Sequence, residues 1–343
     1  MKIDYRPEID GLRAIAVISV IIYHAQITLY GNQILPGGYI GVDIFFVISG
    51  YLITKILLKN EFNYNNYFLF LRNRIKRIFP ALLLLIILSI IFFSALLSPQ
   101  HLVEFGRSVI FNFLLVPNIN FWLESNYFNV SSNFKPLLHT WSLGVEYHFY
   151  LVWPLLFFGL RKIIKSTIYL NIAIIFLIII SITIIELLIL KGPVFETSIF
   201  NQFLYGKYVS DTIFFLSPFR FFQFFIGALL AINNFRIISN LINEILFIIG
   251  LVLILSSAIL LNDEVTYPNY LALLPTIGAG LLIFSKKSKY FGNFLRSNIS
   301  NYIGNISYSL YLYHWPVIIF FKYYFFRFLF FYEKIICVII SIF

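Results

Sequence analysis

The first side chains in the sequence that can do chemistry interrupt an apolar run. Arg13 and His24 stand in "GLRAIAVISVIIYHAQ", residues 11–26. On a helix they would be about three turns apart, so both point to the same side and are separated by about 16 Å along the axis. An imidazole can act as a general base or nucleophile, and a guanidinium can bind phosphate oxygens. The plainer interpretation is an anchoring arginine and a packed core histidine.

Cations open a later apolar segment, "FLRNRIKRIFPAL" at residues 70–82. Arg74 and Arg77 are three residues apart and share a helix face, with Arg72 and Lys76 beside them. Arginine binds phosphate in a bidentate fork, so the pattern indicates a phosphate clamp at the cytoplasmic side. An interfacial anchor is the structural alternative.

The stretch "HTWSLGVEYHFYLVWP", residues 139–154, is the densest polar segment. His139, Ser142 and Glu146 fall on one helix face at spacings of three and four. Glu146 would lie about 10 Å deeper than His139, and a carboxylate at that depth in a membrane needs a partner. Histidine and carboxylate in one cavity are the components of general acid–base chemistry. A structural salt bridge is the alternative.

Three further segments carry polar groups where apolar ones are expected. Asp43 lies in "GGYIGVDIFFVISGYLIT", whose glycines permit close helix packing. Arg220 lies in "SPFRFFQFFIGALLA", and Ser307, Tyr311 and His314 share a face of "YIGNISYSLYLYHWPV". Ionisable residues in spanning segments usually face a polar interior and serve function.

The composition predicts a helical, polytopic membrane protein. Of 343 residues, 60% are hydrophobic and 12% charged, whereas soluble domains average about 45–50% and about 25%. The apolar runs are continuous rather than alternating, which favours helices over a barrel. The net charge of +10 fits basic cytoplasmic loops, so we expect a lipid bilayer and no nucleic acid as partner. With Cys337 as the single cysteine and scattered histidines, we expect no metal and no permanently bound cofactor.

We expect one domain, 1–343, with about ten transmembrane helices and a cytoplasmic N-terminus. Basic residues cluster at 55–77, 161–165 and 286–296, and these clusters share a side only if 108–122 is broken or re-entrant. The last apolar run is too short to cross about 30 Å at about 1.5 Å per residue, so we expect a truncated tenth helix. The predicted spans lie near 11–30, 38–57, 78–98, 139–160, 166–190, 214–234, 238–261, 268–285, 301–321 and 335–343.

In this order the motifs resemble the acyltransferase 3 family, membrane enzymes that O-acylate bacterial surface and secreted glycans. The matching blocks are "YRPEIDGLRAIAVISVIIYHA", "GGYIGVDIFFVISGYLIT", "RIKRIFPAL", "KPLLHTWSLGVE", "FYLVWP" and "SYSLYLYHWPV". The subgroup it looks most like often carries an extracytoplasmic SGNH esterase-like domain. The resemblance implies transfer of an acyl group, with acetyl expected, from acyl-CoA to a glycan such as O-antigen lipopolysaccharide or exopolysaccharide. It also implies the bacterial cytoplasmic (inner) membrane.

Roles carry over only to matching positions. Arg13 and His24 match the R-x10-H motif that the family needs for activity, and Arg74 and Arg77 match an R-x-x-R motif associated with acyl-CoA. The expected catalytic residues are therefore His24, Arg13, Glu146 and Asp43. The expected acyl-donor-binding residues are Arg74, Arg77 and Arg13, and the expected supporting residues are His139, Trp141, Ser142, Arg220 and His314.

Two departures from the family pattern bear on these roles. Tyr147 and His148 follow Glu146 where the family usually has Glu and Gln, so the carboxylate that serves His24 stays open between Glu146 and Asp43. A Y-x-x-x-E-x-P pattern and an SGNH domain are not among the 343 residues, so we expect a C-terminally truncated membrane domain. A transporter or flippase of an anionic or lipid-linked substrate and an inactive truncated product are the alternatives.

Overall fold

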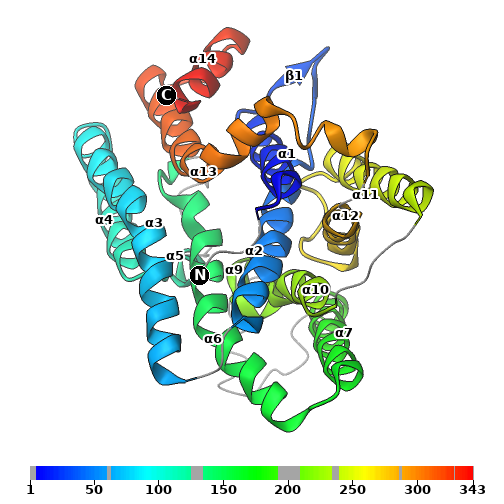
Figure 1. Ribbon diagram of the computed structural model, residues 1–343. Coiled ribbons are helices and arrows are strands. Elements are labelled where there is room, and N and C mark those ends of the chain that lie inside the picture. The colour runs from blue at the N-terminus through cyan, green and yellow to red at the C-terminus, as the bar shows by residue number, and fades with distance from the viewer. Residues whose placement is uncertain are drawn as a thin grey trace.

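The computed structural model describes residues 5–59, 63–124, 134–191, 209–233, 239–285, 288–327 and 329–342. These residues are largely helical, which agrees with the predicted all-α membrane protein (Figure 1). The strands among them form a short antiparallel hairpin, β1 (Thr28–Leu29) and β2 (Asn32–Gln33). The helices are α1 (Pro7–His24), α2 (Gly41–Leu58), α3 (Tyr64–Phe93), α4 (Pro99–Phe113), α5 (Pro117–Leu123), α6 (Trp141–Ile163), α7 (Thr167–Lys191), α9 (Val209–Phe215), α10 (Phe221–Ile232), α11 (Asn240–Leu260), α12 (Leu273–Phe284), α13 (Asn298–Phe325) and α14 (Phe331–Ile342).

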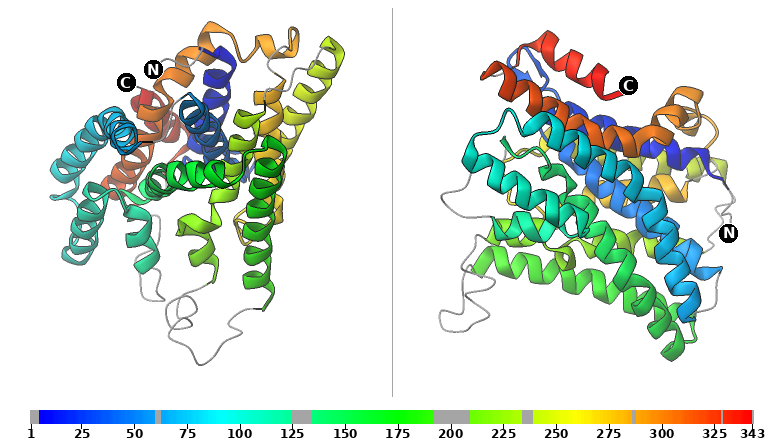
Figure 2. Two further views of the ribbon diagram at one scale, coloured as in Figure 1. Left: turned by 60° about the horizontal axis from the view of Figure 1, so that its bottom comes forward. Right: turned by 90° about the vertical axis from the view of Figure 1, so that its left-hand side faces the viewer.

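Helix α1 lies in the interior of the bundle and contacts α2, α12 and α13. It begins at Pro7, a position where the missing N–H of proline costs no helical hydrogen bond. Helices α3 and α4 lie on the opposite side of the molecule from α11 and α12 (Figures 1 and 2). Residues carried by α1 therefore face neighbours that come from both ends of the sequence.

Two glycines bring α1 close to its neighbours. A Cβ at Gly41 of α2 would overlap the backbone carbonyl of Ala16, and a Cβ at Gly304 of α13 would overlap the carbonyl of Asp10. Small residues let helix backbones approach one another in membrane bundles. This close approach places the side chains of α1 and α13 within hydrogen-bonding reach of each other.

The segment 108–122 is broken, as its proline predicts. Helix α4 ends at Phe113, Leu115 has a positive φ of 63°, and α5 begins at Pro117. Proline cannot donate a helical hydrogen bond and disfavours helical geometry in the residue before it. The membrane depth of this segment stays a prediction.

Three predicted spans have different boundaries. The helix within 11–30 ends at His24 and is followed by the β1–β2 hairpin. Span 214–234 is not one helix, because a break around Pro218 separates α9 from α10. Helix α3 begins at Tyr64 rather than near residue 78, so the predicted arginine clamp lies in mid-helix and not at a helix end.

Five helices in the described part are long and apolar enough to cross a membrane. The apolar residues of α7 are largely exposed, with Phe176 at 61% and Ile179 at 56%, as expected for a surface that faces lipid. The count of ten spans stays a prediction, and two basic residues used for it, Lys286 and Lys287, lie outside the described residues. The five helices are Gly38–Leu58, Tyr64–Phe93, Leu138–Ile163, Thr167–Leu190 and Asn240–Leu260.

Replacing Gly304 with alanine should separate α13 from α1 and lower the thermal unfolding temperature in detergent, because the new methyl group meets backbone that cannot move aside. Gly106→Ala is the matched control, since its Cβ would meet nothing within 4 Å and alanine is the better helix former. An unfolding temperature for Gly304→Ala equal to that of the control would contradict the close-packing argument.

Candidate active site

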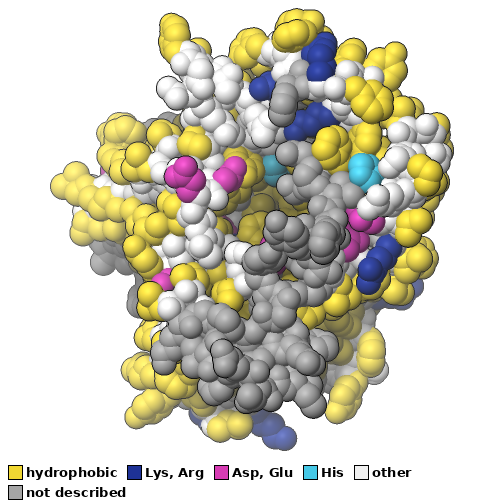
Figure 3. Space-filling model, turned by 180° about the vertical axis from the view of Figure 1, so that it is seen from behind, with side chains coloured by type: hydrophobic (Ala, Val, Ile, Leu, Met, Phe, Trp, Pro, Cys, Tyr) yellow, Lys and Arg dark blue, Asp and Glu magenta, His cyan; other side chains and the backbone are white. Residues whose placement is uncertain are grey.

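A cavity of about 620 Å³ lies between α1, α2, α6 and α13 and the segment 262–267. We call it the outer cavity, and its lining includes His24, Asp43, His139 and Arg220. Seen from behind, the molecule shows acidic side chains and a histidine close together beside a hollow (Figure 3). These four residues lie on separate segments of the sequence, and the fold brings them together in the lining of one cavity.

His24 is paired with another histidine. Its Nδ1 lies 2.8 Å from Nε2 of His314, and the two rings are near-parallel, at 8°, with centroids 5.1 Å apart. Trp315 packs against the His24 ring at 4.7 Å. Among the described residues neither ring is paired with a carboxylate, so the expected contact of His24 with Glu146 or Asp43 is replaced by His314.

Asp43 is hydrogen-bonded and ion-paired within a buried polar cluster. It accepts hydrogen bonds from Gln223 at 2.5 Å and from the hydroxyl of Tyr267, and it forms an ion pair with Arg220 at 3.4 Å. Asp43 and Arg220 are each about 1% exposed. A guanidinium this deeply buried needs its counter-charge, which explains why Asp43 is not free to serve His24.

The Arg220 guanidinium is also held by aromatic rings. Its Cζ lies 5.1 Å from the ring centroid of Trp141 and 4.8 Å from that of Phe214, whose carbonyl accepts from Nε. Arginine over an aromatic face gains cation–π attraction, which is strongest away from water. Trp141 therefore supports the cluster through Arg220.

His139 and Ser142 are tied to α13. The Nε2 of His139 donates to the carbonyl of Leu312 at 2.9 Å. The Tyr311 hydroxyl donates to the carbonyl of His139 at 2.9 Å and lies 2.7 Å from the Ser142 hydroxyl. These contacts fix the start of α6 against α13 beside the paired rings of His24 and His314.

A second cavity, the inner cavity, measures about 260 Å³ and is basic. Arg13, Arg74 and Arg77 line it together with Glu146. Arg13 is paired with Asp10 at 2.7 Å, whereas Arg74 and Arg77 form no ion pair with the described residues. The lining thus carries three guanidinium groups and one carboxylate, a balance of charge that would suit an anion.

Glu146 is held at this inner cavity and not at the histidines. One carboxylate oxygen accepts from the hydroxyls of Ser49 and Tyr150. Neither hydroxyl was singled out in the sequence, because nothing in the local pattern of α2 or α6 indicates that the two helices share a carboxylate. Glu146 therefore contributes charge next to the arginines.

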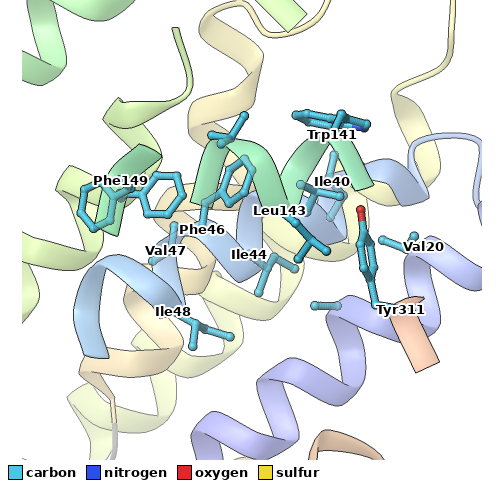
Figure 4. Packing of buried hydrophobic residues seen from close by; sticks show 14 of the residues in the cluster. Val20, Ile40, Ile44, Phe46, Val47, Ile48, Trp141, Leu143, Phe149 and Tyr311 are labelled. Atoms are coloured by element: carbon cyan, nitrogen blue, oxygen red, sulfur yellow. The ribbon is translucent and has the colours of Figure 1, made fainter. Parts of the chain in front are cut away.

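The two cavities share a partition. Val42 and Tyr311 line both. Figure 4 shows Tyr311 reaching from α13 towards the segment of α6 that carries Trp141 and Leu143. The basic cavity and the histidine cavity therefore adjoin at these two side chains.

Comparison with known proteins decides the family. The sequence model of the acyltransferase 3 family, described as an acyltransferase domain, matches residues 6–343. The chain belongs to the acyltransferase 3 family. Nearly the whole chain therefore corresponds to the domain of this family that the sequence motifs indicated.

The curated relatives are O-acetyltransferases by name. O-acetyltransferase OatA of Staphylococcus aureus is 32% identical over 339 residues, which are 92% of this chain and 51% of that protein. The putative peptidoglycan O-acetyltransferase YrhL of Bacillus subtilis is 32% identical over 343 residues, 92% of this chain and 49% of that protein. The chain thus spans about half the length of these relatives. No solved structure matches it significantly.

The residues that the structure describes include no candidate metal centre. No group of three or more histidine, cysteine or acidic side chains comes close enough to bind an ion there.

Asp43→Asn should destabilise the folded state by about 3–5 kcal/mol, because it leaves the buried Arg220 charge without compensation. Thermal unfolding in detergent measures this loss. The double variant Asp43→Asn with Arg220→Gln should unfold at a higher temperature than the single variant. Asp263→Asn changes an exposed acid of the same cavity and should have little effect. A double variant no more stable than Asp43→Asn would refute the pairing argument.

Proposed function

We propose that this acyltransferase moves an acyl group, acetyl in the first instance, from cytoplasmic acyl-CoA to a hydroxyl of a cell-surface or secreted glycan. The observation that carries the proposal is the pair of cavities, one basic and one lined by histidines, that share the Val42–Tyr311 partition. The names of the relatives, one of them a putative peptidoglycan O-acetyltransferase, support a glycan acceptor. O-antigen and exopolysaccharide belong to the same chemical class.

The inner cavity suits the donor. Arg74 and Arg77 with Arg13 would hold CoA phosphates, because guanidinium forks match phosphate oxygens. A cavity of about 260 Å³ is too small for the whole nucleotide, so the nucleotide would stay at the mouth and the narrow pantetheine arm would enter. The axial separation of Arg13 and His24, about 16 Å, is comparable to the length of that arm.

The outer cavity suits the chemistry. The glycan hydroxyl would attack the thioester carbonyl while His24 accepts its proton as general base. The new C–O bond forms as the C–S bond breaks, and the CoA thiolate then takes the proton from the imidazolium. Glu146 would balance charge at the inner cavity, and Asp43 would hold Arg220 beside the acceptor site.

The proposed orientation follows the basic segments. The arginines of the inner cavity would face the cytoplasm and the outer cavity the opposite side, with a cytoplasmic N-terminus and ten spans. The bacterial cytoplasmic membrane is the compartment that gives one protein access to both CoA and surface glycans.

His24→Ala should abolish acyl transfer while the protein still folds. The other histidine in the described lining of the outer cavity, His139, is buried and could not replace the partly exposed His24. Purified full-length protein in lipid is supplied with labelled acetyl-CoA and a glycan acceptor, and labelled glycan is measured. His101→Ala is the control, because His101 contacts Tyr323 and lines neither the outer nor the inner cavity. Full activity of His24→Ala would refute the catalytic role, and glycan flux without acyl transfer in the unaltered protein would favour a transporter.

Arg74→Ala and Arg77→Ala should each weaken acyl-CoA binding by at least tenfold, the equivalent of about 1.4 kcal/mol, because each removes a charge-assisted phosphate contact. Binding of a non-hydrolysable acetyl-CoA analogue, measured by calorimetry, tests this. Arg72→Ala is the matched control, since Arg72 lies on the same helix, is exposed and lines neither cavity. Equal affinities for all three variants and the unaltered protein would remove the donor role.

A further inference from the structure

The histidine pair is the end of a hydrogen-bonded chain that starts at the backbone of α13. The Nδ1 of His314 lies 3.1 Å from the carbonyl oxygen of Leu310. A carbonyl oxygen can only accept, so the hydrogen of this bond must belong to Nδ1 of His314. A neutral imidazole carries one ring hydrogen, and Nε2 of His314 is then left as a bare acceptor.

The second bond of the chain follows from the first. Nε2 of His314 lies 2.8 Å from Nδ1 of His24, so His24 must supply the hydrogen at Nδ1. Near-parallel ring planes with centroids 5.1 Å apart are the geometry of two rings that meet edge to edge, with the hydrogen on the line between the nitrogens. Nε2 of His24 is then the bare nitrogen.

Both rings are neutral in this arrangement. His314 is fully buried, and in the described part of the chain neither ring has a carboxylate partner that would balance a positive charge. An uncompensated charge in such a place is costly. With both rings neutral, the Leu310 carbonyl accepts from Nδ1 of His314, and Nε2 of His314 accepts from Nδ1 of His24.

We propose that His314 is a positioning residue that fixes His24 in the Nδ1–H tautomer and so presents the bare Nε2 of His24 to the outer cavity. His24 lines that cavity and its side chain is partly exposed, and no described residue hydrogen-bonds its Nε2. The opposite tautomer would turn an N–H towards the acceptor hydroxyl and could not take its proton. The catalytic consequence rests on the proposed function, whereas the tautomer itself does not.

The hydrogen bond between His24 and His314 would also stabilise His24 after it has accepted the proton of the acceptor hydroxyl. When His24 becomes an imidazolium, its Nδ1–H bond to the neutral His314 becomes charge-assisted and strengthens. His314 would thus favour the charged form of His24 in the transition state while keeping the resting ring neutral. A carboxylate in the same place would stabilise the charge more but would itself have to be buried as an anion.

Nitrogen NMR on the full chain in lipid nanodiscs, with 15N-labelled histidine, tests the tautomer directly. The His24 signals are assigned by their absence from His24→Ala. We expect Nδ1 to be protonated and Nε2 bare in the unaltered protein. A His24 ring protonated at Nε2 would overturn the proposal, and this result would be obtained whether or not the protein transfers acyl groups.

Two substitutions at His314 test the consequence. His314→Gln can place its amide oxygen near the former Nε2 and should keep kcat within about tenfold, whereas His314→Leu removes the acceptor and should lower kcat about 10²–10⁴-fold with KM for acyl-CoA unchanged. Tyr313→Phe, on the same helix, is the control for packing. Equal kcat values for the Gln and Leu variants at equal unfolding temperatures would overturn the positioning role. If His314→Leu does not fold, a His314→Gln variant that folds but whose His24 ring is protonated at Nε2 would overturn it.

Discussion

The cost of burying polar groups among apolar helices is the constraint on which this structure depends. A guanidinium and a carboxylate that are about 1% exposed can persist only as partners, so Arg220 and Asp43 fix α2 against the segment that opens α10. The same requirement joins α6 to α2 through Glu146 and Ser49. Polar contacts of this kind occupy the bundle interior, and the two cavities are the spaces that remain between them.

The close contact of α1 with α13 brings together the two histidines of the proposed reaction. Gly304 lets α13 approach the backbone of α1, and further along the same two helices His24 meets His314. The Leu310 carbonyl that orders the hydrogen bonds lies on α13 itself, so the direction of the chain is set within one helix. The packing of α1 against α13 therefore also determines the proposed tautomer of His24.

Local periodicity could predict which residues share a helix face, but it could not predict which helices meet. The fold places Arg13 with Arg74 and Arg77 at one cavity and His24 with Asp43 at the other, while the roles of these residues stay predictions. The partner of His24 was not predictable, because it lies 290 positions away and a carboxylate was the expected chemical choice. Tyr267 was missed for the same reason, since nothing near it in the sequence points to Asp43. Helix ends were displaced where prolines and a hairpin intervene.

A histidine supported by a neutral histidine suits the proposed reaction better than it would suit amide or ester hydrolysis. A thiol has a pKa of about 8.5, so a CoA thiolate leaves a thioester without help from a strong general acid. The base then needs only to remove the proton of the attacking hydroxyl, and its positive charge is short-lived. The fold can therefore leave the carboxylate out of the histidine pair and place Asp43 and Glu146 beside arginines, whose fixed charges balance them.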